Sequence, residues 1–533
     1  MRRYSDIESN DPILFSYQKE MKHNVFTKWD KMDNIMVQMP TGTGKTILFA
    51  SIVKDIRNWI ISNNTHSHIL ILAHVRELIQ QAADKLSRRG IDSGIIMSGY
   101  PLQLEKIVQV ASIQTFMSSR NKDRMAIEHF DYIIIDEAHH SMAPRYKELW
   151  EMFPNSKKLG VTATPWRMNH SGFTTLYDDI IISHPIEWFV KEGYLSNYDY
   201  ISIAPDSEIQ HEINSIDKFG VDGDYLEEEL ISRFDKDSIR AKLYDSYHKY
   251  CNGKKGIIYA INRQHAANIT STYAANGVSI EMIDGTTPKN TREQLLEDFR
   301  CGDLQVIVNV NIFSEGFDCP DIEFIQLARP TKSLALYLQQ IGRGLRVSNE
   351  KEKGLILDNV GLYNRFGTPM ANRMWHYHFE GHEKDIHAYN DGSGIMRDII
   401  FEERIPDYEE GDEQMILVEH AEGKRQIRSD KSEDSSYGIG DFNVFKKQGK
   451  YGMCSRNNRT IIPPIYEDMH PYHKGYIPFK LNGKWGIMLS NGVVKVKPKY
   501  FNIGAFENGK AIVQNTSESE IYYINDKLER IDI

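Results

Sequence analysis

The chain has 533 residues, of which 41% are hydrophobic and 26% charged, and its formal net charge is −10. This composition is ordinary for a globular protein, and the length is too great for a single core, so several domains are expected. No apolar run approaches the roughly 20 residues that span a bilayer, and the first residues lack the apolar segment of a signal peptide. The four cysteines form no C-x-x-C pair, so neither a disulfide framework nor a zinc ribbon is indicated, and a reduced, cytoplasmic protein without a membrane partner is predicted.

The first part of the chain alternates short apolar runs with helical patterns. "NIMVQM" predicts a strand, "TILFASIVKDIRNWI" a helix, "HILILAH" a strand, "RELIQQAADKL" a helix and "DYIIID" a strand. Buried strands that alternate with helices indicate an α/β domain with a parallel sheet. We place this domain at residues 1–205, and interpret the polar, acidic residues 206–237 as a linker.

The same rhythm returns from residue 238 to 362. "GIIYA", "SIEMID", "QVIVNV", "EFIQLA" and "KGLILDN" predict strands, and "SLALYLQQIGRGL" predicts a helix. Residues 401–434 hold 12 acidic and 5 basic side chains, which favours a solvated connector, so residues 363–436 are assigned to an accessory, acidic connector.

Residues 437–533 contain an internal repeat. Six pairs lie 34 residues apart: Gly449/Gly483, Tyr451/Trp485, Gly452/Gly486, Pro464/Pro498, Tyr466/Tyr500 and Gly475/Gly509. Glycine, proline and short apolar runs predict β-hairpins, and "IYYIND" is expected to begin a third unit. The segment carries 14 Lys/Arg against 9 Asp/Glu, in contrast to the acidic remainder.

Three motifs carry the predicted chemistry, and the first is the loop "PTGTGKT" between a strand and a helix. Its residues Thr41, Gly42, Thr43 and Gly44 are predicted to turn backbone N–H groups toward phosphates. Lys45 is expected to reach the β- and γ-phosphates, and the Thr46 hydroxyl to hold Mg²⁺. A plain glycine-rich turn is the alternative, which the strand–loop–helix context disfavours.

The other two motifs supply acids and arginines. In "IIIDEAHH", Asp136 ends an apolar strand where a Mg²⁺-binding carboxylate is expected, Glu137 is placed to deprotonate the attacking water, and His139 is expected to couple this strand to neighbouring loops. In "QQIGRGLR", Arg343 and Arg346 share a helix face and are predicted to act as arginine fingers. Solvated acids and surface ion pairs are the respective alternatives.

Taken in order, "YQKE", "MPTGTGKT", "AHVREL", "SIQTF", "DEAH", "TATP", "IDGTT", "NIFSEGFD" and "QQIGRGLR" resemble the motifs of superfamily 2 helicases of the DEAD/DEAH type, over about residues 12–362. The stretch around "DEAHHSMAPRY" and "LDNVG" resembles RadD-type bacterial repair helicases. The resemblance implies an α/β fold with two tandem RecA-like lobes, followed by the connector and a mainly β module. That module resembles WG-repeat proteins, in which it is regarded as an interaction platform, although its aromatics could equally form the core of small β-units.

The resemblance also implies roles for matched positions. Gln18 would read adenine, Gly316 and Asp318 would sense the nucleotide from the second lobe, and Gln339 would complete the ATP site. Thr162 and Thr164 would couple hydrolysis to lobe movement. Residues implied in contacts with the nucleic-acid backbone are Arg76, Gln114, Thr115, Arg263 and Thr286. The arginine usual before "YQ" is absent, which leaves only the fine structure of the adenine pocket open.

The sequence therefore predicts an ATP- and Mg²⁺-dependent nucleic-acid motor, with DNA favoured over RNA and a protein partner possible at the repeats. Only 20 residues separate Asp318 from Gln339, which leaves no room for a duplex-separating hairpin and favours translocation or remodelling over processive unwinding. The alternative is an ATPase that acts as a sensor or scaffold and recruits a partner through the WG repeats without moving a strand. The sequence does not indicate the oligomeric state.

Overall fold

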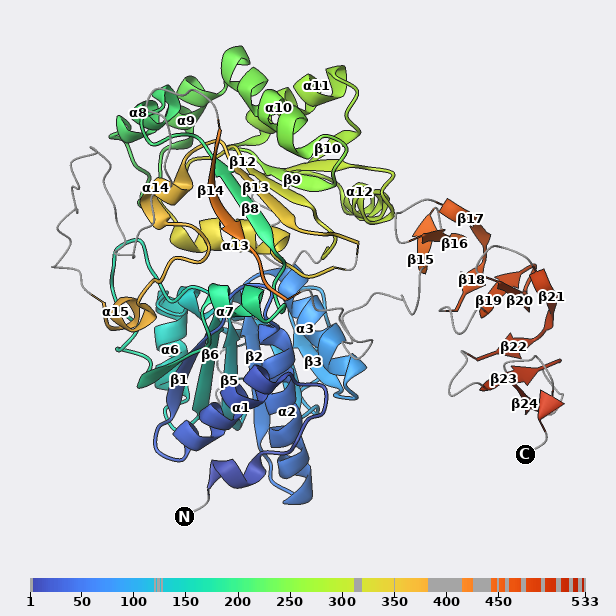
Figure 1. The fold of residues 1–533 in the computed structure, drawn as a ribbon. Coiled ribbons are helices and arrows are strands. Elements are labelled where there is room, and N and C mark those ends of the chain that lie inside the picture. The colour runs from blue at the N-terminus through green and yellow to red at the C-terminus, as the bar shows by residue number, and fades with distance from the viewer. Residues whose placement is uncertain are drawn as a thin grey trace. The chain divides into compact units, whose positions relative to one another are not determined.

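The computed structural model describes residues 3–118, 121, 125, 128–310, 319–348, 350–381, 415–424, 442–447, 450–455, 460–470, 476–489, 494–504, 510–516, 521–525 and 530–531. Two α/β lobes with parallel sheets are followed by antiparallel β-sheets, which confirms the predicted fold class. Helices pack around the sheet of each lobe (Figure 1).

Lobe 1 contains a seven-stranded sheet in the order β3-β4-β2-β5-β6-β1-β7, whose paired strands are all parallel. The strands are almost wholly buried, as expected where helices cover both faces of a parallel sheet. The strands are β1 (Asn34–Gln38), β2 (His68–Ala73), β3 (Ser93–Ile96), β4 (Val108–Ser112), β5 (Phe130–Asp136), β6 (Lys157–Thr162) and β7 (Asp179–Ile182). The helices are η1 (Tyr4–Ile7), α1 (Ser16–Trp29), α2 (Lys45–Ser62), α3 (Arg76–Arg88), α4 (Ile113–Phe116), η2 (Ala138–His140), α6 (Pro144–Met152) and α7 (Ile186–Lys191).

Lobe 2 is built on a second seven-stranded sheet, in the order β10-β11-β9-β12-β13-β8-β14. Its strands are β8 (Tyr198–Ser202), β9 (Gly256–Tyr259), β10 (Ile280–Ile283), β11 (Val306–Asn309), β12 (Phe324–Leu327), β13 (Gly354–Asp358) and β14 (Ile416–Ala421). The helices that follow or precede these strands are α8 (Glu208–Asn214), α9 (Glu227–Phe234), α10 (Asp237–Cys251), α11 (Arg263–Ala275), α12 (Lys289–Cys301), α13 (Leu334–Gly344), α14 (Leu362–Phe366) and α15 (Trp375–Glu380).

The boundary between the two sheets differs from the predicted one at residue 205. Strand β8 pairs in parallel with β13, with Tyr198 opposite Gly354, so it belongs to the second sheet. Just before β8, the Ser196 N–H donates to the carbonyl oxygen of Leu345 at 2.8 Å. The chain therefore enters lobe 2 before Tyr198, directly beside the end of helix α13.

The acidic segment 206–237 was predicted to be a linker, but it contains helices α8 and α9 and packs on lobe 2. Asp224 is buried, and its carboxylate accepts hydrogen bonds from the Thr331 hydroxyl and the Lys332 N–H, both at 2.7 Å. The acidic composition of this segment indicated a solvated linker. That prediction is wrong because one of the acidic side chains is buried and accepts hydrogen bonds inside the lobe.

The connector also contains structured parts that return to the lobes. Phe379 of α15 is buried in the core of lobe 1, where its ring stacks on Phe173. The backbones are close there, since a Cβ on Gly172 would lie 2.2 Å from the carbonyl oxygen of Glu380. Strand β14 then joins lobe 2 as the antiparallel neighbour of β8.

The C-terminal module consists of three small antiparallel sheets in its described residues. They are formed by β15 (Phe442–Lys447), β16 (Lys450–Ser455) and β17 (Thr460–Tyr466); by β18 (Asp468–Met469), β19 (Tyr476–Leu481), β20 (Lys484–Leu489) and β21 (Val494–Tyr500); and by β22 (Asn502–Ile503), β23 (Lys510–Gln514), β24 (Ile521–Asn525) and β25 (Arg530–Ile531). Trp485 and Tyr500 are buried in a shared apolar cluster with Ile524, so these aromatics do form a core and the third unit exists.

Among the residues that the structure describes, no helix is long and apolar enough to cross a membrane.

Candidate nucleotide site

The phosphate-binding loop follows β1 and leads into the N-terminus of α2. Gly42 and Gly44 adopt φ values of +86° and +84°, a left-handed conformation that side-chain-bearing residues rarely take. Lys45 is the first residue of α2, an 18-residue helix, with Thr46 beside it. The loop therefore presents the helix N-terminus and its partial positive charge where phosphate groups would bind.

The two acids lie at the carboxyl end of β5. Asp136 is the last residue of the strand and is 8% exposed. Glu137 has a φ of +50°, and its N–H donates to Asp136 Oδ1 at 3.0 Å. His139 Nδ1 lies 3.4 Å from Glu137 Oε2 and 3.1 Å from Thr162 Oγ1. This histidine contacts both the acidic strand end and the "TATP" loop, and its coupling role stays a prediction.

The "TATP" stretch begins at Thr162, the last residue of β6, which lies between β5 and β1 in the sheet. Thr162 and Thr164 are both buried, and the Thr164 N–H donates to Thr162 Oγ1 at 3.1 Å. The Met39 N–H, at the start of the phosphate-binding loop, donates to the Thr162 carbonyl at 3.0 Å. Three motifs thus meet at the carboxyl ends of three neighbouring strands.

Helix α13 of lobe 2 brings Arg343 to the loop of lobe 1. The helix ends at Gly344, so Arg346 lies beyond it and the predicted shared helix face of the two arginines is wrong. A Cβ on Gly342 would lie 2.6 Å from Thr41 Cβ, and a Cβ on Gly42 would lie 3.5 Å from Arg346 Cγ. Arg343 is 5% exposed and Gln339 is 6% exposed. The absence of side chains at positions 42 and 342 permits this close contact between the lobes.

The charges converge on Lys45. Burial lowers the pKa of its ammonium group, Glu137 and Asp136 raise it, and Arg343 and Arg346 lower it further, so that the net shift is downward. Three cations and two carboxylates therefore share one site. A bound anion with several negative charges, such as a nucleoside triphosphate, would offset the repulsion among these three cations.

Gln18 is almost fully buried behind the phosphate-binding loop. Its Oε1 accepts from the Phe15 N–H at 3.0 Å, and its Nε2 donates to the Thr43 carbonyl at 3.2 Å. The Tyr17 hydroxyl donates to the same carbonyl at 2.8 Å. Gln18 therefore holds the loop, whatever contact it makes with adenine.

An aromatic cluster stands beside Gln18, where the motif usually has an arginine. Phe15 stacks on Tyr17, and the Tyr17 ring meets Tyr194 edge-on with centroids 4.8 Å apart. Trp188 stacks on Tyr194 at 5.6 Å. Sequence reasoning missed Tyr17, Trp188 and Tyr194, because about 170 residues separate the two halves of the cluster.

The Tyr17 hydroxyl gives a first testable prediction. Replacing Tyr17 by Phe removes one buried hydrogen bond to the loop, which contributes about 0.5–1.5 kcal/mol. We therefore expect the KM for ATP to rise about 2- to 10-fold with little change in kcat. Steady-state ATP hydrolysis measures this. Tyr250→Phe, which removes a hydroxyl that donates to the Met415 carbonyl in lobe 2, is the control. Equal KM values for both variants would contradict the role of Tyr17.

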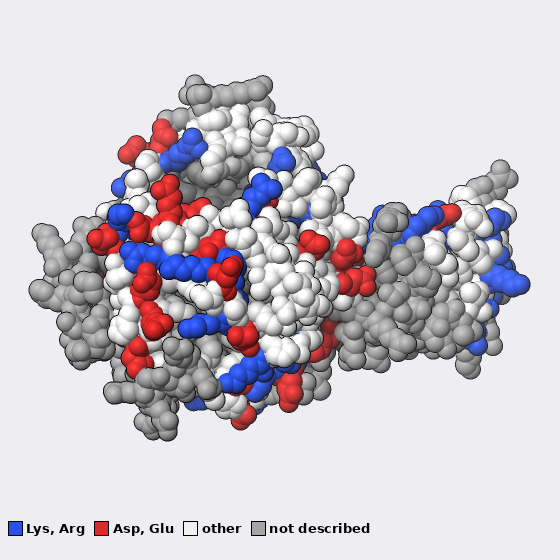
Figure 2. Space-filling view, turned by 90° about the horizontal axis from the view of Figure 1, so that it is seen from above, with Lys and Arg blue, Asp and Glu red and all other residues white. Residues whose placement is uncertain are grey.

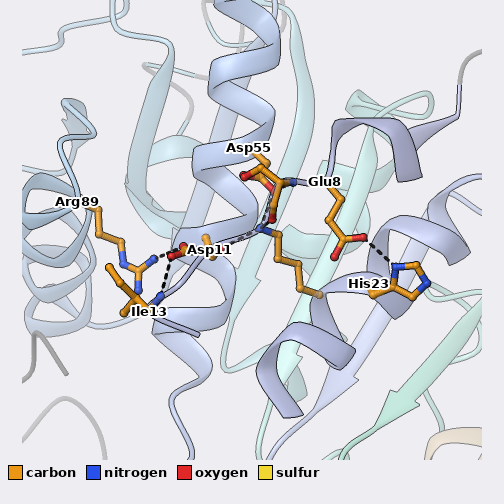
Figure 3. Close-up of polar contacts among 9 residues, drawn as sticks. Glu8, Asp11, Ile13, His23, Asp55 and Arg89 are labelled. Atoms are coloured by element: carbon orange, nitrogen blue, oxygen red, sulfur yellow. Dashed lines mark hydrogen bonds and ion pairs between the residues drawn. The ribbon is translucent and has the colours of Figure 1, made fainter. Parts of the chain in front are cut away.

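Behind the loop, buried ion pairs join three helices and the N-terminal segment (Figure 3). Lys22 Nζ on α1 lies 2.6 Å from Asp55 Oδ2 on α2, and both side chains are 1% exposed. Arg89, which follows α3, lies 2.9 Å from Asp11 Oδ2. Ser51 connects the pairs, because it accepts from Lys22 at 3.1 Å and donates to Asp11 at 2.9 Å. This buried network fixes α1, with Gln18, against α2, with Lys45.

The charge state of Asp11 depends on these partners. Burial alone would raise its pKa, but the Ser51 hydroxyl, the Ile13 N–H and Arg89 together hold the pKa of the carboxyl below its usual value. The carboxylate is therefore ionised near neutral pH, as the ion pair with Arg89 requires.

Removing one charged member of this buried network should lower the unfolding free energy of lobe 1. Lys22→Met leaves the Asp55 carboxylate buried without its cation, and we expect a loss of about 3–5 kcal/mol in the unfolding free energy of lobe 1. Urea unfolding followed by tryptophan fluorescence, to which buried Trp29 contributes, measures it. Lys191→Met, which breaks the exposed pair with Glu187, is the matched control and should have a small effect. Equal losses in the two variants would show that burial of the pair is unimportant.

The predicted nucleic-acid contacts occupy exposed or half-exposed positions. Arg76 is exposed at the start of α3, where its guanidinium donates to the Ser98 carbonyl at 2.8 Å. Gln114 is exposed and accepts from Ser112 at 2.7 Å, and Thr115 beside it is half-buried. Arg76 and Gln114 follow the neighbouring strands β2 and β4, so the sheet brings them to one edge.

The remaining predicted residues lie in lobe 2. Arg263 is exposed at the start of α11. Thr286 is also exposed, and its N–H and hydroxyl both donate to Asp284 at 2.9 Å. The predicted nucleotide sensors Gly316 and Asp318 lie outside the described residues.

Comparison with known families agrees with this arrangement. Residues 11–167 match the family described as type III restriction enzyme, res subunit, and residues 239–348 match the helicase conserved C-terminal domain. Residues 451–485 and 486–516 match the WG containing repeat.

Individual relatives point the same way. The chain is 32% identical over 346 residues to a 51.5 kDa protein of Lactococcus phage (isolate 7-9), covering 65% of this chain and 70% of that protein. It is 27% identical over 400 residues to the putative ATP-dependent helicase IRC3 of Saccharomyces cerevisiae, covering 73% of this chain but 57% of the relative. A fragment of a putative HsdR subunit of a type I restriction enzyme from Vibrio vulnificus YJ016 shares the fold, with a TM-score of 0.54, 18% identity, and coverage of 71% of this chain and 69% of the other.

The chain therefore belongs to the superfamily 2 helicases, and carries WG repeats in its C-terminal region. It is an ATP hydrolase of the helicase or translocase type that binds nucleic acid. The narrower resemblance to RadD-type helicases stays a prediction.

Proposed function

We propose that the chain hydrolyses ATP between its two lobes and uses the cycle to translocate along DNA. The observation that supports this most is the contact between Gly342 of α13 and Thr41 of the phosphate-binding loop. Any phosphate group held by the loop would lie near Arg343 and Arg346. Closure of the lobes around ATP and their separation after hydrolysis would then move the bound strand.

Within lobe 1, the loop from Thr41 to Gly44 would cradle the phosphates, and Lys45 would neutralise them. Thr46 and Asp136 offer the hydroxyl and carboxylate oxygens that suit Mg²⁺, one at the helix start and the other at the end of β5. The bound ion would neutralise phosphate charge. Glu137 would take the proton from the attacking water, and its contact with His139 keeps it oriented.

Lobe 2 would complete the site. Arg343 and Arg346 would stabilise the charge that develops on the transferred phosphoryl group, and Gln339 would position them or the water. We propose Gly316 and Asp318 as nucleotide sensors on the family resemblance alone. The contact of Glu137 with His139, and the hydrogen bonds from His139 to Thr162 and from Thr164 to Thr162, would transmit the state of the nucleotide to the lobe surface.

DNA would cross the exposed positions of Arg76, Gln114, Thr115, Arg263 and Thr286. These residue types contact phosphates and sugars, so binding should be independent of sequence and strongly dependent on salt. The preference for DNA over RNA rests on the resemblance to RadD-type helicases and on the restriction-enzyme family that matches lobe 1.

The experiment uses the full-length protein with single-stranded, duplex and forked DNA and the corresponding RNAs. ATP hydrolysis and displacement of streptavidin from a biotinylated strand are measured across a salt series. We expect DNA to stimulate hydrolysis and streptavidin to be displaced only with ATP. Stimulation without displacement would overturn translocation and favour the sensor or scaffold, which recruits a protein partner through the WG repeats. Stimulation by RNA alone would overturn the choice of DNA.

A further inference from the structure

Strand β21 carries three lysines on one face. Lys495, Lys497 and Lys499 alternate along the strand and are all exposed, and we refer to them as the basic ladder. Val496 and Tyr500 point to the other face, where they pack with Trp485. The alternation places three ammonium groups on a single surface, at steps of about 6.8 Å, because each strand residue advances about 3.4 Å.

Within the described part of the chain, none of these three cations forms an ion pair, and their only close partner is the Tyr500 ring, 4.9 Å from the Lys499 ammonium. On the described part of the C-terminal module, Figure 2 shows basic side chains gathered with few acidic ones among them. The surface therefore presents positive charge that is available to a partner.

The repeat itself does not require lysine at these positions. The equivalent residues 34 positions earlier, on β17, are Ile461, Pro463 and Ile465. The inward residues are matched instead, since Tyr466 corresponds to Tyr500. The same strand can thus be formed with apolar residues at these positions, so the ladder is a property of the second repeat and not of the fold.

We propose that the basic ladder binds the sugar-phosphate backbone of the nucleic acid on which the core acts. An extended strand with regularly spaced cations matches a single polynucleotide strand with regularly spaced anions. Phe501 directly follows strand β21 and is 49% exposed, so it offers a surface on which a base can stack. The inference rests on the proposed action on DNA and adds a second contact region to it.

Two competing roles for the ladder lysines predict different results. Lysines on an edge strand, such as β21 in its sheet, hinder edge-to-edge aggregation. An acidic protein partner would also be attracted to three lysines. Neither of these roles requires any contribution to binding of DNA.

The test compares two full-length triple variants of equal charge. K495Q/K497Q/K499Q removes the ladder, and K450Q/K484Q/K510Q removes three exposed lysines from other strands of the same module. Binding of a fluorescein-labelled poly-dT oligonucleotide is measured by anisotropy over a salt series. We expect the ladder variant to bind about tenfold more weakly, and the slope of log K against log salt to fall by about 2, because roughly 0.7 counterion is released per contact with a single strand. The control should keep the affinity and slope of the wild type.

Unchanged affinity and slope in the ladder variant would overturn the proposal. This holds whether or not the variant aggregates, as the edge-strand role predicts, or loses binding to polyglutamate, which stands in for an acidic protein partner. Equal losses in both triple variants would also overturn it, because they would reflect total charge instead of the ladder. ATP hydrolysis by the wild type with the same oligonucleotide is recorded separately. Failure of the ladder is thus distinguishable from failure of the proposed function in the core.

Discussion

Replacing Glu137 by Gln should lower kcat for nucleic-acid-stimulated ATP hydrolysis by about 10²- to 10⁴-fold, the usual contribution of a general base. The amide has nearly the same shape as the carboxylate but cannot accept a proton from water. Because Lys45 and the phosphate-binding loop are unaltered, ATP affinity should change little. Steady-state hydrolysis and fluorescent-nucleotide binding, measured on the same preparation, separate the two effects.

The matched control is Glu187→Gln, which makes the same chemical change at an exposed glutamate of the same lobe. It should hydrolyse ATP at the rate of the wild type. Full activity in the Glu137→Gln variant would show that another group takes the proton, and would contradict the role of Glu137 as the general base.

Arg343→Gln should reduce kcat by about 10³-fold, at the lower end of the range for an arginine finger. The side chain is buried beside Lys45, and glutamine keeps hydrogen-bonding capacity while removing the positive charge. Arg343→Lys should also be strongly impaired, because a single ammonium group does not reproduce the planar fork of guanidinium. ATP hydrolysis at saturating nucleic acid measures both variants.

Arg233→Gln provides the control for a general loss of arginine in lobe 2, since Arg233 forms half-buried ion pairs with Glu212 and Glu229. Thermal melting of all three variants shows whether the fold persists. If folded Arg343→Gln keeps more than a tenth of the wild-type kcat, the arginine does not act on the transition state.

The local parts of the site could be predicted because each depends on neighbouring residues. A strand, a glycine-rich loop and a helix encode the phosphate cradle within about 25 residues, and Asp136 is marked by the end of an apolar run. The close contact of Gly342 with Thr41 joins residues 301 positions apart, and only the family resemblance suggested it.

The features that the sequence did not reveal all depend on contacts between residues far apart in the chain. Nothing in the local pattern of β8 shows which sheet it joins, because both sheets accept a buried apolar strand equally well. Tyr17 meets Tyr194 through the packing of α1 near α7, which no spacing along the chain reveals. Acidic composition similarly marks the 206–237 segment as solvated, whereas Asp224 accepts hydrogen bonds inside lobe 2.

The return of α15 to lobe 1 has a consequence for how the enzyme can move. The polypeptide enters lobe 2 before Tyr198, returns to lobe 1 before Phe379, and joins lobe 2 again at β14. The Lys424 N–H, just after β14, donates to the Lys191 carbonyl of lobe 1. Two bodies joined by several chain crossings have fewer relative motions open to them than two bodies joined by one linker. Wide separation of the lobes would strain these connections, so we expect the lobes to open only to a limited extent in each ATP cycle.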